Sequence, residues 1–216
     1  MISYESFVSR IYIEASGCPE PLAIQVIRDA AIDFCVRSNF IQRDMDPIAA
    51  QAGVADYDLE PPAQQLVVKI MKCWYKDYEL NPIAPDYVKD PAFYNVNIPN
   101  NPQSIGEPLV FTQKDERTFS IYPIPKETTQ DALTLRISCK PTRASTTCEN
   151  SLFEDYLDVI ANGALSRLVS ATGKPYSAPS MVMFYTNKFL AGVNEARQRA
   201  SRGNVRANMQ VRMRSI

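Results

Sequence analysis

The stretch SLFEDYLDVIANGALSRLVSATGKPYSAPSMVMFYTNKFLAGVNEARQRAS, residues 151–201, decides the fold. Apolar residues recur every three or four positions on both sides of a short turn at 173–177. This spacing predicts two amphipathic helices, because one helical turn takes 3.6 residues. Two long helices joined by so short a turn pack antiparallel. The stretch therefore predicts a helical hairpin.

Local signals predict the ends of these two helices. Ser151 and Glu154 have the spacing of a capping box, in which each side chain bonds a free amide of the first turn. Gly173 is the expected end of the first helix, and the second is expected from 177–179 to Gly203. The predicted core-facing residues of the second helix are Met181, Phe184, Tyr185, Phe189 and Val193.

Two further helices are expected near the N-terminus. Helical spacing of apolar residues predicts a short helix from Tyr4 to about Gly17. Another is expected from Pro19, since proline is tolerated in a first helical turn, to about Asn39. Its predicted core-facing residues are Ala23, Val26, Ile27, Ala30 and Phe34.

The middle of the chain, from about residue 42 to 143, consists of short β-rich segments punctuated by proline. The clearest strand is 133–140, whose strict alternation predicts one buried and one wet face. The predicted buried residues are Leu133, Leu135, Ile137 and Cys139, and the predicted wet residues are Thr134, Arg136, Ser138 and Lys140. Further strands are expected at 54–59, 66–75, 78–80, 109–113 and 118–123, a helical turn at 86–89 and a loop at 95–108.

The expected fold class is therefore α+β. A four-helix bundle drawn from both chain ends carries an inserted antiparallel sheet or small sandwich and an extended basic C-terminal arm. The predicted domains are 1–41 with 150–202 for the bundle, 42–149 for the β-rich insertion and 203–216 for the arm.

Composition narrows the class of protein. The chain has 216 residues and 45% hydrophobic content, enough for a real core. No run approaches the roughly 18 apolar residues of a membrane span, and the N-terminus lacks a secretory pattern, so we expect a soluble chain made in the cytoplasm. Widely spaced cysteines without a CxxC pair favour buried free thiols over disulfides or metal sites. These are Cys18, Cys35, Cys73, Cys139 and Cys148.

Little in the chain supports catalysis. It contains no histidine, which removes Ser-His-Asp and Cys-His arrangements and nearly all zinc sites. No glycine-rich phosphate-binding motif is present. Acids do cluster, but they are explained by the wet face of a strand and by the favourable placement of acids at a helix N-terminus. The clusters are Asp44/Asp46, Asp56/Asp58 and Glu154/Asp155/Asp158. We predict no catalytic residue, no metal and no cofactor.

The C-terminal stretch 196–216 has six arginines, no lysine and no acid. Because the whole chain has a formal charge of −1, residues 1–195 carry −7 (−1 minus 6). Arginine forms bidentate contacts with carboxylates and phosphates, so the arm suits an acidic protein groove or nucleic acid, with a solvated terminus as the plain alternative.

The apolar residues interleaved in this arm favour a protein partner over DNA. The run MQVRM at 209–213 alternates apolar and polar residues, which suits an extended segment laid on a sheet edge or in a groove. A nucleic-acid-binding module remains the alternative function. The predicted contact residues are Arg197, Arg199, Arg202, Arg206, Met209, Val211, Arg212, Met213, Arg214 and Ile216.

An aromatic group in the middle of the chain is a second candidate surface. Trp74, Tyr75 and Tyr78 lie close to several lysines, an arrangement able to stack nucleic-acid bases. A sheet edge packed against the bundle is the favoured interpretation. A contact surface for another subunit or a tail component is the next.

Four stretches together resemble a known family. They are 26–60, 67–82 (VVKIMKCWYKDYELNP), 111–127 (FTQKDERTFSIYPIPKE) and 152–200, with its run IANGALSRL followed by GKPYS. In this order they are similar to head-to-tail adaptor (neck, tail tubular A-like) proteins of tailed bacteriophages, most of all short-tailed ones. The match is one of pattern and order, without a catalytic motif.

The resemblance implies a structural role in the virion. Such adaptors form a ring, typically dodecameric, under the portal protein and offer a platform for the next tail component, a nozzle, tube or fibre protein. The bundle would build the ring, and the arm would clasp the portal. Genomic double-stranded DNA would pass through the channel, which suits an acidic body that does not hold its cargo. The family implies no cofactor, and assembly in the host cytoplasm.

Overall fold

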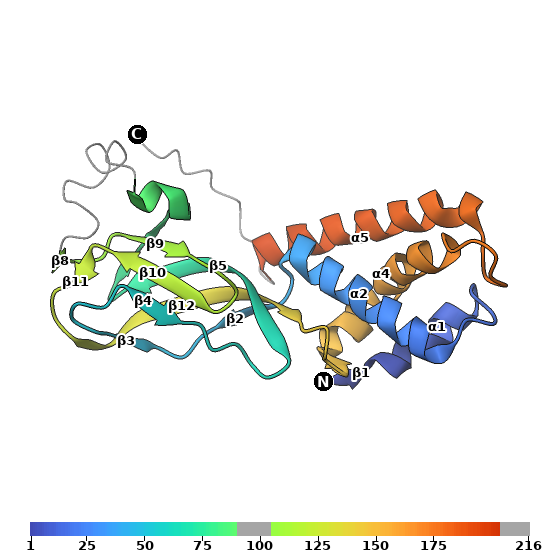
Figure 1. Cartoon of the computed structure of the whole chain (residues 1–216), viewed down its shortest axis with the longest axis horizontal. Coiled ribbons are helices and arrows are strands. Elements are labelled where there is room, and N and C mark those ends of the chain that lie inside the picture. Colours follow the sequence, from blue (N-terminus) through green and yellow to red (C-terminus); the bar gives the residue numbers. More distant parts are fainter. Residues whose placement is uncertain (90–104, 204–216) are drawn as a thin grey trace. The chain divides into compact units, whose positions relative to one another are not determined.

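The computed structural model describes residues 1–89 and 105–203 (Figure 1). The chain divides into two compact units, Met1–Ile41 with Pro141–Ile216, and Gln42–Lys140. The first is helical and the second is built from strands, so the predicted α+β class with four helices is confirmed. The predicted loop at 95–108 lies mostly outside the described residues, and so does the arm from residue 204 on.

Three long helices dominate the helical unit and contact one another (Figure 1). Within the described ranges, no helix combines the length and apolar character of a membrane span. The long helices are α2 (Glu20–Ser38), α4 (Asn150–Val169) and α5 (Val182–Arg202). The short elements are η1 (Tyr4–Phe7), α1 (Val8–Tyr12), η3 (Pro179–Met181) and the antiparallel pair β1 (Ile2–Ser3) with β13 (Thr147–Cys148).

The core of this unit follows the helical spacing of the sequence. Ala23, Ile27, Ala30 and Phe34 of α2 are fully buried, as predicted. The Phe34 ring lies 4.9 Å, centroid to centroid, from that of Tyr156, where α4 departs from helical geometry. Burial of such aromatic side chains is a large contribution to core stability.

Reciprocal glycines allow α4 and α5 to approach closely. A Cβ atom on Gly163 of α4 would lie 2.7 Å from the Phe189 ring of α5. A Cβ atom on Gly192 of α5 would overlap the side chain of Val159 of α4. Because interiors are close-packed, a larger residue at either position forces the helices apart.

Ion pairs join the helices at their surfaces. Arg10 of α1 donates to Asp158 of α4 at 2.7 Å. Arg199 near the end of α5 donates to Asp155 at 3.1 Å. Arg167 of α4 donates to Asp33 of α2 at 3.0 Å. Acids near the start of α4 therefore connect it to its neighbours.

Two predicted features of the α4 ends are wrong. The helix begins at Asn150, and Glu149, with extended backbone, is its N-cap, without a side-chain capping bond. Ser151 therefore lies inside the first turn and the capping box does not form. The helix ends at Val169, and Gly173 lies in the following turn with φ +71. The predicted end of α5 is confirmed, because the Gly203 amide caps the helix.

The described residues of the β unit form two larger sheets and one strand pair. One sheet has the order β4 (Asp56–Asp58), β10 (Thr118–Tyr122), β9 (Val110–Gln113) and β7 (Asn81–Pro82). The other has the order β2 (Gln42–Asp44), β12 (Thr129–Pro141), β5 (Gln65–Tyr75) and β6 (Tyr78–Glu79), with β3 (Ile48–Ala50) also on β12. The pair is β8 (Ile105–Gly106) with β11 (Ile124–Pro125), and η2 (Pro85–Lys89) precedes the undescribed segment.

Two pairings depart from the antiparallel sheet that the sequence predicts. β7 runs parallel to β9, and β8 runs parallel to β11. β7, β8 and β11 each have only two residues, too few to show an alternation of apolar and polar residues in the sequence. The sequence also does not predict β2 and β3. Each has only three residues, and the side chains along it do not alternate strictly between buried and exposed.

The longest strand, β12, supplies the core of the β unit. Leu133, Leu135, Ile137 and Cys139 are buried as predicted. Ser138 was expected on the wet face but is fully buried, so the wet face is covered at this position. The prediction of buried free thiols is confirmed, since all five cysteines are buried and none forms a disulfide.

Candidate interaction surfaces

The C-terminal arginines that the structure describes differ in their surroundings. Arg199 is held by Asp155 and contributes to the contact between α5 and α4. Arg197 and Arg202 are exposed, and no ion pair is found for them within residues 1–89 and 105–203. The other predicted arm residues lie outside the described part of the chain. They are Arg206, Met209, Val211, Arg212, Met213, Arg214 and Ile216.

Helix α5 has a buried apolar face and, in addition, exposed apolar side chains. Tyr185, Phe189, Val193 and Ala196 pack inward, as helical spacing requires. Met181 and Phe184, predicted to face the core, are instead 37% and 46% exposed. Phe184 precedes the buried Tyr185 by one position, and adjacent helical residues point about 100° apart, so both cannot face the core centre.

The outer face of α5, defined as Met183, Asn187, Leu190 and Asn194, carries no charge. These residues recur every three or four positions and all are exposed, with Met183 at 66%. Exposed apolar residues on one helix face mark a contact surface more often than singly scattered ones. The seven-residue spacing of Met183 and Leu190 is the sequence signal that identifies this face.

The three predicted aromatic residues do not form one patch. Trp74 pairs with Glu79, and Tyr75 pairs with Tyr78, across β5 and β6. Because directly paired residues share a face and successive ones alternate, Trp74 lies on the opposite face from the two tyrosines. Tyr75 is buried whereas Tyr78 is 69% exposed.

One member of each acid pair singled out in the sequence has a structural partner, Asp44 with Arg136 and Asp56 with Lys114. Asp56 accepts hydrogen bonds from Lys114 at 2.7 Å and from Ser120 at 2.6 Å, which hold its pKa below the usual range. In the described ranges, no group of three or more potential ligands is arranged to hold a metal ion.

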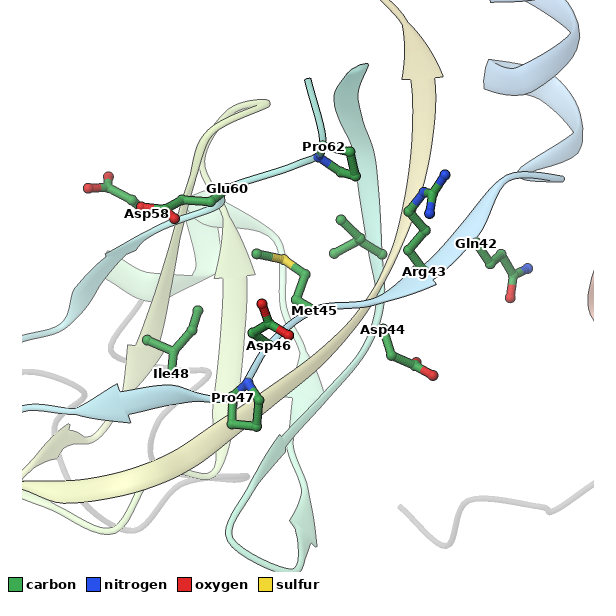
Figure 2. A pocket seen from close by; sticks show the side chains of 11 residues that line it. Gln42, Arg43, Asp44, Met45, Asp46, Pro47, Ile48, Asp58, Glu60 and Pro62 are labelled. Carbon is green, nitrogen blue, oxygen red and sulfur yellow. The ribbon is translucent and has the colours of Figure 1, made fainter. Parts of the chain in front are cut away.

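A groove of about 690 Å³ opens in the β unit (Figure 2). One side is built by β2 and the segment that leads into β3, and another by the end of β4 and the residues that follow it. We call it the acidic groove. It is lined by Gln42, Arg43, Asp44, Met45, Asp46, Pro47, Ile48, Asp58, Glu60, Pro62 and Ile137.

The carboxylates of the acidic groove are mostly unpaired. Asp44 forms two hydrogen bonds with Arg136, at 2.7 and 3.1 Å, which lower the pKa of Asp44. Asp46, Asp58 and Glu60 are exposed, and none has an ion pair with another described residue. The sequence does not predict this site, because residues 42–48 and 58–62 belong to different sheets and come together only in the folded unit.

Comparison with known proteins identifies a family. The model of the family described as SU10 adaptor protein matches residues 7–214, nearly the whole chain. No curated protein matches the chain.

Proposed function

The chain belongs to the SU10 adaptor protein family, a family of phage head-to-tail adaptors, and from this membership we propose that it forms a ring between portal and tail. The family is one of structural adaptors and not of enzymes. The match over residues 7–214 carries the proposal, because it includes both units and most of the C-terminal arm. The protein then extends the DNA channel and docks the next tail component within the virion.

The arm is the proposed portal-binding element. The stretch 196–216 has six arginines among apolar residues, three of them in the arm, and α5 already presents Arg197 and Arg202 without ion pairs among the described residues. Guanidinium groups and alternating apolar side chains suit an acidic groove of a preformed partner. A contact of the arm with the portal brings the copies together at the place where the ring forms.

The outer face of α5 is the proposed contact between neighbouring copies. A closed ring uses a heterologous interface, so each copy presents two different faces. An uncharged helix face about 17 Å long is suited to packing on another helix. The resemblance implies twelve copies. Tyr78 stays a proposed contact for a tail component, Trp74 is a candidate only for a contact on the opposite face, and Tyr75 is buried in the sheet.

The charge of the remaining chain suits a conduit for DNA. Residues 1–195 carry −7, which opposes retention of passing phosphates. The nucleic-acid-binding alternative assigns the six arginines to DNA. It requires binding that falls steeply with salt, because each phosphate contact releases counterions.

Native mass spectrometry of the chain mixed with its cognate portal ring tests the proposal. The full chain is expected to saturate the ring, and a chain stopped after Arg202 is expected not to bind. Replacing Arg206, Arg212 and Arg214 by glutamine is expected to weaken binding at least about tenfold, given that charge-assisted hydrogen bonds are among the stronger ones.

A matched control replaces three exposed lysines, Lys69, Lys126 and Lys174, by glutamine and is expected to leave portal binding unchanged. If the arm variants bind as well as the parent, the portal contact lies outside the arm. If no form binds the portal and the full chain instead binds duplex DNA in a salt-dependent way, the nucleic-acid function replaces the adaptor role of the arm.

A further inference from the structure

The acidic groove combines an apolar floor with a charged rim. Met45 and Ile48 are half-buried, and Ile137, which also lines the groove, is fully buried. Asp46, Asp58 and Glu60 line the same groove, with Asp58 and Glu60 together on one side of it (Figure 2). A groove with both features suits a segment whose apolar side chains alternate with cationic ones, because the floor takes the former and the rim the latter.

The groove is also long enough for an extended segment. Asp44 pairs with Arg136, and Ile48 pairs with Leu133, so residues 42–48 follow the edge of β12. Seven residues along a sheet edge span about 20 Å. An isolated ion needs less room and a tighter set of ligands, and no metal-binding group is found within the described ranges.

The chain itself contains a segment with the complementary chemistry. Residues 204–216 (NVRANMQVRMRSI) contribute three arginines and no acid, interleaved with Val205, Met209, Val211, Met213 and Ile216. Thirteen residues reach up to about 45 Å when extended, more than the length of the groove. Charge complementarity and the alternation therefore match this segment to the groove.

We propose that the acidic groove of one copy receives residues 204–216 of a second copy before the portal is met, and that the portal then displaces them. The proposal rests on the portal-binding role given above to the same segment. Because one set of arginines cannot pair with two partners at once, groove and portal compete for it.

Such a contact has a physical benefit during assembly. An unoccupied arginine-rich segment binds nucleic acid non-specifically through phosphate contacts. Holding it against the carboxylates of another copy neutralises both charges and brings copies together in the order that a ring requires. The acidic groove is then a holding site for the arm, and the portal its final partner.

Photo-crosslinking of the full chain tests this contact. A benzophenone amino acid replaces Val211, and ¹⁵N-labelled and unlabelled copies are mixed in equal amounts. Crosslinks between labelled and unlabelled copies that end at residues 42–62 are expected. The double variant Asp58→Lys with Glu60→Lys is expected to lower their yield about tenfold, as expected for reversing two rim charges.

The control variant Asp77→Lys with Asp86→Lys changes two exposed acids of the same unit outside the groove and is expected to keep the yield. As a second measurement, 0.5 M NaCl is expected to lower the yield of the unmodified chain, independently of any effect of substitutions on folding. Unchanged yield in the groove variant, crosslinks within single copies only, or crosslinks elsewhere in the chain would each overturn the proposal.

Adding the portal ring separates this inference from the proposed function. If the ring binds and the groove crosslinks disappear, displacement is supported. If the ring binds and the crosslinks persist, the competition is refuted. If the ring does not bind but the groove crosslinks form, the portal role fails while the contact between copies stands.

Discussion

The helical unit and the acidic groove of the β unit use their acidic side chains differently. In the helical unit, Asp33, Asp155 and Asp158 each pair with an arginine of another helix. In the β unit, Asp46, Asp58 and Glu60 line one groove and have no ion pair with another described residue. The comparison indicates that charge in the helical unit contributes to its own packing, whereas charge in the acidic groove is available to a partner.

The largest effect on stability is expected where helices α4 and α5 pack closely at a glycine. Gly192→Val adds side-chain atoms that overlap Val159, so we expect a loss of about 2–4 kcal/mol in the free energy of unfolding. The neighbouring Ala191→Val places the same side chain on the exposed side of α5 and is expected to cost below about 1 kcal/mol. Urea denaturation measures both. Equal losses would show that α4 and α5 do not approach closely at Gly192.

A smaller effect is expected when an ion-paired acid of the helical unit and an unpaired acid of the groove are each replaced by asparagine. Asp33 is 25% exposed and accepts from Arg37 at 2.6 Å and Arg167 at 3.0 Å. Asp33→Asn is therefore expected to cost about 1–2 kcal/mol of stability, because two charge-assisted bonds are weakened. Asp58→Asn in the groove is expected to change stability by less than about 0.5 kcal/mol. Thermal unfolding of both variants sharpens the comparison, and a larger loss for Asp58→Asn would reverse it.

The smallest effect concerns Asp44, the groove acid that does have a partner. Its hydrogen bonds and charge interaction with Arg136 hold the pKa of Asp44 below the usual range. A carboxyl with a lowered folded-state pKa stabilises the fold above its unfolded pKa, about 3.9, and loses this contribution as pH falls through the folded value. Asp44→Asn is therefore expected to lose less stability than the parent between pH 5 and pH 2 (both roughly).

Urea titrations of parent and variant across this range measure the difference. We expect it to be small, because the Asp44 side chain is 68% exposed and water screens the pair. Equal losses of unfolding free energy in the two proteins as the pH falls would show that the ion pair does not form in solution.

The sequence by itself determined the features that depend on local periodicity. The helical spacing of Ala23, Ile27 and Phe34 and the alternation of Leu133 to Cys139 predict faces that are buried in the structure. These patterns are legible because 3.6 and 2 residues per repeat bring neighbours in sequence onto one face. The arginine content of the arm and the family resemblance are likewise read from the sequence alone.

Only the tertiary structure decided which distant segments meet. It separates Trp74 from Tyr75 and Tyr78, and it buries Ser138. It also joins residues 42–48 with 58–62 into the acidic groove. The physical reason is that strand pairing and helix packing depend on contacts between residues far apart in the chain, for which local spacing carries no signal.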